Sequence, residues 1–120
     1  MARTAVAIIS MNSAGSSVNP TLTTMDATNN HVITPDRAYR RLFLVAQNTF
    51  AGSKTVTLKA GAYPPASRKH LGDLTITLTQ NQWVYQQIDG SRFAQADGTI
   101  NVDLAAATTG TIGVFGLVRL

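Results

Sequence analysis

The sequence contains no cysteine and no glutamate, and it has few charged residues of either sign. Without cysteine the chain has no disulfides, no thiolate metal ligands and no cysteine nucleophile, and its redox compartment stays undetermined. All six acidic residues are aspartate, so the Glu–Lys pairs that support exposed helices are missing. Charged residues make up 13% of the chain, about half the usual share. The surface must then be rich in small polar side chains, which is typical of surfaces that lie against other protein.

Long apolar runs are also missing from the sequence. No stretch approaches the ~20 apolar residues of a membrane span, so no membrane partner is expected. The short run at residues 5–9 follows a single arginine and precedes no convincing cleavage site. We therefore interpret residues 1–10 as a first strand rather than a signal peptide.

Short alternating segments dominate the chain from residue 41 onward. Apolar side chains occupy every second position, with Thr, Lys, Asn or Asp between them, most clearly at residues 55–60, 74–79 and 99–104. This period of two is the pattern of half-buried β-strands, because successive side chains point to opposite faces. Residues 41–46 and 111–120 are apolar at nearly every position, as expected for strands covered on both faces. No helix is expected.

Turn signals separate these segments. Asp89-Gly90 and Asp97-Gly98 are strong ones because glycine accepts positive φ, and residues 92–95 between them are predicted as a short strand. One domain with a core of its own is expected at this length. The spacing of strands and turns predicts an all-β fold, a single antiparallel β-sandwich of jelly-roll-like type.

The N-terminal part does not share the alternation. Residues 11–34 are rich in Ser, Asn and Thr, and a connection this long is usually functional or disordered. We expect residues 1–34 to form an N-terminal strand and an extended arm, and residues 35–120 to form the β-sandwich body. The alternative is a surface loop ordered by contacts with its own body.

Residue types that carry catalysis are scarce. His31 and His70 have no second histidine or carboxylate at a metal-ligand spacing, so both are expected to be solvated. A pair of aspartates could serve as acid and base in glycoside hydrolysis. However, turn or strand positions account for four of the six, Asp73, Asp89, Asp97 and Asp103. We therefore predict a protein that is not an enzyme, with no catalytic residue, no cofactor and no metal.

Basic residues give the chain a formal charge of +4 and a pI near 10.0. They gather in two clusters, Arg37, Arg40 and Arg41 in one and Arg68, Lys69 and His70 in the other. The guanidinium fork suits carboxylates and phosphates, so Arg37, Arg40 and Arg41 are candidate partner contacts. Nucleic-acid binding would be better supported by exposed aromatics among the charges. A carboxylate-lined protein partner is favoured over nucleic acid, and a merely solvated rim is the other interpretation.

The aromatic residues are expected to be structural. Phe43, Phe115 and Trp83 are predicted to lie in the core. Trp83 and Tyr85 share one face of a strand, and with Tyr63 they could form a platform for a sugar ring. Such a pair more often fills a core or a subunit interface, which we favour.

The order of segments along the chain carries a resemblance. Residues 32–37 lead into the strand at 42–48, then come 56–61, 73–78 and 97–102, and the chain ends with the apolar segment 113–120. Residues 31–120 resemble small virion structural proteins of tailed bacteriophages, in particular capsid decoration (cement) proteins with a compact β-sandwich. Residues 1–30 carry no part of this resemblance.

The resemblance implies a location on the exterior of a virion capsid, assembled in the host cytoplasm. It implies binding to the major capsid protein, stabilisation of the shell, and self-association as a homotrimer rather than a dimer. The C-terminal strand would then cover a subunit interface as well as a core, and the arm would pair with a neighbour's sheet edge. Many identical weak contacts on a lattice gain by multivalency. A phage tail or baseplate component and a carbohydrate-binding β-sandwich module are the alternatives.

Overall fold

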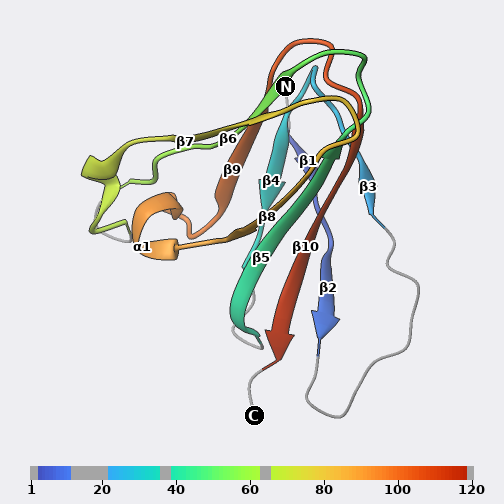
Figure 1. Ribbon diagram of the computed structural model, residues 1–120. Helices are drawn as coiled ribbons and strands as arrows, with labels where there is room; N and C mark the ends of the chain where they lie inside the picture. The colour runs from blue at the N-terminus through green and yellow to red at the C-terminus, as the bar shows by residue number, and fades with distance from the viewer. Residues whose placement is uncertain (1–2, 12–21, 36–38, 63–65, 119–120) are drawn as a thin grey trace.

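The computed structural model describes residues 3–11, 22–35, 39–62 and 66–118, which form two β-sheets that share one core (Figure 1). Across the first sheet the strands are β1 (Thr4–Ala5), β4 (His31–Ile33), β9 (Ile100–Leu104), β6 (Lys54–Leu58) and β7 (Leu74–Leu78). Across the second they are β2 (Ile8–Met11), β10 (Gly110–Val118), β5 (Tyr39–Asn48) and β8 (Trp83–Gln87), and β3 (Thr23–Thr24) also pairs with β10. The all-β sandwich expected from the alternation is confirmed.

The sheets are mixed rather than purely antiparallel. The pairing of β1 with β4 and of β2 with β10 is parallel, and every other strand pairing in the described residues is antiparallel. Both parallel pairs involve the N-terminal strands. The chain passes from the first sheet to the second between Ala5 and Ile8, with the buried Val6 at the crossing.

The core consists of the inward side chains of both sheets. The residues on the inner faces include Ile33, Val56, Leu58, Leu78, Ile100 and Val102 from the first sheet and Leu42, Leu44, Ala46, Ile112 and Val114 from the second. The aromatic residue of this core is Phe93, at 2% exposure. Its position comes from a helical turn and not from a strand.

That turn corrects the expectation of a strand at residues 92–95. Residues Gly90–Phe93 form a short helix, α1, and Lys69–Leu71 form a 3-10 turn, so the prediction of no helix is also wrong. Asp89 caps α1, since its carboxylate accepts from the backbone N–H of Ser91 at 2.9 Å. An aspartate followed by glycine can act as the N-cap of a helix as readily as it can begin a reverse turn, because its carboxylate accepts from nearby backbone N–H groups in both.

The N-terminal third belongs to the sandwich wherever the structure describes it. Met25 lies in the core, and His31 and Ile33 are fully buried in β4, between β1 and β9. The prediction of an extended arm is therefore wrong for residues 22–34, which belong to the sandwich. Residues 12–21 lie outside the described residues. The sequence pattern missed these strands because β3 and β4 are too short to show a period.

Candidate functional site

The outer face of the second sheet carries the largest exposed side chains of the described residues. Along β5 the even positions Leu42, Leu44 and Ala46 point into the core, so the odd positions point outward. The strand register places Phe43 opposite Phe115, and Val45 opposite Tyr85. We call these four residues together with Trp83 the aromatic face. It occupies three neighbouring strands, β10, β5 and β8.

Two rings stand out from this face. Tyr85 is 74% exposed and Trp83 is 41% exposed. Their ring centroids are 6.3 Å apart and their planes differ by 17°, so the two rings lie nearly parallel. The prediction that Trp83 lies in the core is wrong, because β8 is an edge strand and turns its odd positions toward solvent.

A shallow apolar hollow lies beside the two rings. Its volume is about 290 Å³, and Phe43, Val45, Tyr85 and Phe115 line it. Phe43 and Phe115 are partly exposed and lie outside the core cluster, so their assignment to the core is also wrong. Val45 is 5% exposed, although it too faces away from the core.

Two residues limit the aromatic face on its β2 side. Gly113 faces outward from β10, and Leu22 lies so close over it that a Cβ at this position would meet the Leu22 side chain. Ile9, opposite Phe115 on β2, approaches the same point. The described residues thus cover one flank of the outer sheet face and leave the β8 flank exposed.

The first basic cluster is only partly within the described residues. Arg41 is exposed at one end of the outer face, opposite Leu117 of β10. The backbone of Arg40 belongs to β5, but its side chain lies outside the description, and so does Arg37 as a whole. The structure therefore places one of the three predicted contact residues beside the aromatic face.

The second basic cluster lies elsewhere. Arg68 forms an ion pair with Asp89 at 2.9 Å, and His70 is exposed in the 3-10 turn. This arrangement ties the loop after residue 65 to the cap of α1, so Arg68 already has a partner within the fold.

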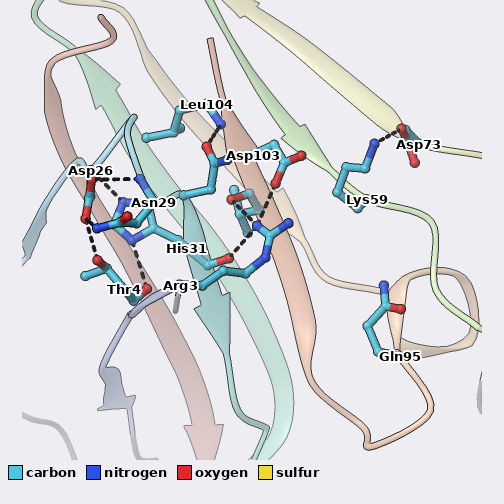
Figure 2. A network of polar contacts seen from close by, with 12 residues as sticks. Arg3, Thr4, Asp26, Asn29, His31, Lys59, Asp73, Gln95, Asp103 and Leu104 are labelled. Atoms are coloured by element: carbon cyan, nitrogen blue, oxygen red, sulfur yellow. Dashed lines mark hydrogen bonds and ion pairs between the residues drawn. The ribbon is translucent and has the colours of Figure 1, made fainter. Parts of the chain in front are cut away.

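A separate network of polar side chains surrounds the buried His31 and joins it to β1 (Figure 2). His31 is fully buried, and the expectation that it is solvated is wrong. Its Nε2 accepts from the backbone N–H of Asp26 at 2.9 Å, and its Nδ1 lies 3.1 Å from the carbonyl oxygen of Thr4. A neutral ring with the proton on Nδ1 satisfies both contacts. Burial is the main cause that lowers the pKa of His31.

The Asp26 carboxylate also has structural partners. It accepts from the Thr4 hydroxyl at 2.6 Å and from the backbone N–H groups of Thr28 and Asn29. The Thr4 bond, followed by the Asn29 backbone bond, lowers the pKa of Asp26 to about 2. Because the imidazole contacts backbone atoms and not the Asp26 carboxylate, Thr4, Asp26 and His31 do not form a proton relay. The network holds β1 against β4.

Arg3 extends this network across the first sheet. Its guanidinium contacts Asp103 at 2.6 Å and the carbonyl oxygen of His31, as Figure 2 shows. It also donates to the carbonyl oxygen of Val102. The Asp73 carboxylate accepts from Lys59 and from the backbone N–H of Ala60. The Asp89 carboxylate accepts from Ser91, and the Asp97 carboxylate accepts from Thr99. The structural roles predicted for these aspartates are confirmed.

Metal ligands do not gather in the part of the chain that the structure describes, where no group of three or more His or Asp residues could hold an ion. Within the same residues, none of the helices has the length and apolarity that crossing a membrane requires.

Comparison of the chain with family models, with curated proteins and with solved structures finds no match in any of the three. The aromatic face is therefore the strongest candidate for function.

Proposed function

We propose that this protein is a non-enzymatic structural component of a phage virion, a decoration protein that binds the exterior of the capsid and stabilises it. The observation that carries the proposal is the aromatic face. Large apolar side chains exposed together on a rigid sheet mark a protein-contact surface, because exposing them to water costs free energy. The resemblance of residues 31–120 to decoration proteins supplies the virion setting.

The composition of the face supports a protein partner. Tyr, Trp and Phe are enriched at the centres of protein interfaces, where they supply most of the binding energy. Arg41 at the end of the face suits a carboxylate on the rim of such a contact. The same residue types are also found where subunits of one assembly meet, so major capsid protein and further copies of this chain are both expected partners.

The direct test uses virions produced from the genome that encodes this chain. Capsids and tails are separated, and copies of the chain in each are counted by quantitative mass spectrometry. Many copies per capsid, together with a lower temperature of DNA release when the gene is deleted, are the expected result. Absence from capsids would refute the proposal, and recovery in tails would assign the chain to the tail or baseplate.

A carbohydrate-binding module is the second candidate, and the Trp83–Tyr85 pair favours it. Two exposed, nearly parallel rings at 6.3 Å could stack against the apolar face of a sugar. Tyr63, the third residue predicted for such a platform, lies outside the described residues. Trp83 is the sole tryptophan of the chain, so its fluorescence reports on this site directly. An unchanged spectrum across a broad panel of glycans would eliminate this candidate.

A further inference from the structure

We infer that the aromatic face is covered by the same face of a second copy of this chain, in a two-fold dimer. The inference rests on the proposed function, because it names a partner for the contact surface proposed there. Three properties of the face support a second copy: its charge, its size and its shape.

The charge of the face suits contact between identical chains. Two copies carrying +4 each repel unless they meet where charge is low. The outward side chains from Phe43 to Gln47, Trp83 to Gln87 and Thr111 to Leu117 are all uncharged. Arg41 lies at one end of this region. Identical chains can therefore meet at the centre of the face without burying a charge.

The size of the face fits a weak, concentration-dependent contact. Three strands about 4.8 Å apart, crossed with the nine residues of β10 at about 3.4 Å each, give an open face of roughly 14 by 30 Å. This is about 400 Å² per copy and about 800 Å² in total, which is below the ~1,200 Å² of a stable interface and in the range of weak, reversible ones. Pairs of sheets commonly pack in this way, about 10 Å apart.

The shape of the face is complementary to itself. Trp83 projects at one end of β8, and the hollow lined by Phe43, Val45, Tyr85 and Phe115 lies next to it, toward the sheet centre. A two-fold axis that lies in the interface, runs across the strands and crosses β5 near Val45 brings the Trp83 of each copy to the level of the other copy's Phe43, at the edge of its hollow. Each copy then places its Trp83 against the hollow of the other, which is an isologous contact.

The same axis separates the two Arg41 side chains. Arg41 lies about 15 Å along β5 from the axis, so the pair ends up roughly 30 Å apart, beyond the ~10 Å screening length at ordinary salt.

A trimer cannot bury one flat face of every copy against the same face of another. The trimer expected from the resemblance would leave the aromatic face open.

The test measures the mass and the tryptophan emission of the purified chain over about a hundredfold range of concentration, where mass action shifts the equilibrium. We expect the mass to rise from 12.8 kDa to twice that value. The Trp83 emission should move to shorter wavelength over the same range, because the ring leaves water. A monomer with constant emission, or a trimer, would overturn the inference.

Two matched variants locate the contact. Tyr85→Lys places a charge at the most exposed ring of the face and should weaken association at least about 30-fold, as for an interface hot spot. Thr77→Lys adds the same charge on the outside of β7, an exposed position of the other sheet, and should leave association unchanged. Equal melting temperatures of the two variants establish that both fold. Dimerisation of Tyr85→Lys with wild-type affinity would place the contact elsewhere and refute the inference.

The two proposals fail separately. The association measurement contains no capsid, so a dimer that never appears on capsids keeps this inference and refutes the proposed function. A chain that binds capsids but stays monomeric in solution keeps the proposed function and refutes the dimer.

Discussion

Protonation of His31 should destabilise the fold, because both ring nitrogens are already used in their neutral roles. Nε2 accepts from the backbone N–H of Asp26, so a proton on Nε2 would face another donor within a fully buried site. The pKa of His31 is lowered in the folded state, chiefly by burial. The carbonyl of Thr4 and the negative charge of Asp26 oppose this shift, whereas the positive charge of Arg3 adds to it.

The sign and size of the effect follow from proton linkage. Below the ordinary histidine pKa of 6.5 the unfolded chain takes up a proton that the folded chain refuses. Stability is therefore lost as pH falls below 6.5, with a slope that cannot exceed about 1.4 kcal/mol per pH unit for one proton. Asp26, with its pKa near 2, keeps its charge through this window. The other aspartates with a lowered pKa, Asp73, Asp89 and Asp97, lose their contribution only below about pH 4, as they protonate.

Urea unfolding followed from pH 7 to 4.5 measures this loss. His31→Gln replaces the imidazole with an amide that donates and accepts but does not titrate, so this variant should be less stable at pH 7 and lack the slope. His70→Gln removes the exposed histidine and should keep the slope. A wild-type unfolding free energy that stays constant between pH 6.5 and 4.5, or an undiminished slope in His31→Gln, would refute the role assigned to His31.

Three further substitutions, one of them a control, test how the ends of β5 and β10 are held. Gly110→Ala should destabilise the fold by more than about 1 kcal/mol, since Gly110 has φ near +140° and a Cβ there would collide with the Gln47 carbonyl oxygen. Gly90→Ala, where a Cβ meets open space, should be neutral or slightly stabilising in the same thermal melts. Asn48→Leu should cost about 2–4 kcal/mol in urea unfolding, because the buried Asn48 amide bonds Gly52, Leu78 and Phe50. A loss below 1 kcal/mol would show that water replaces these bonds.

The strands were predictable wherever alternation lasted for five residues or more. Residues 55–60, 74–79 and 99–104 all contain strands near the expected bounds, because one face of each packs on the core while the other meets solvent. The turn at Asp97-Gly98 was predictable for a local reason. Gly98 has φ near +87°, and Asp97 bonds Thr99.

The buried histidine was not predictable because its partners are backbone atoms brought together by tertiary structure. Nothing near His31 in the sequence shows that Thr4 will lie beside it, 27 residues earlier, through the parallel pairing of β1 with β4. The same holds for Asn48, whose amide reaches Leu78 on another sheet. Isolated polar residues of this kind have the same sequence signature whether they end in solvent or in the core.

The apolar outer face shows a different limit of the sequence. Residues 41–46 and 111–120 are apolar at nearly every position, which predicts strands covered on both faces. β5 and β10 are central in their sheet, but their outer face is only partly covered, since Phe43 and Phe115 are partly exposed. The sequence pattern does not indicate whether the outer face of these strands is covered by the same chain or by another one. In the structure, Leu22 and Ile9 cover Gly113, whereas Tyr85 and Trp83 stay exposed on the adjoining flank. The described residues thus cover one flank of this apolar face and leave aromatic rings exposed on the other, and that exposed flank is the one that we propose contacts a second copy of the chain.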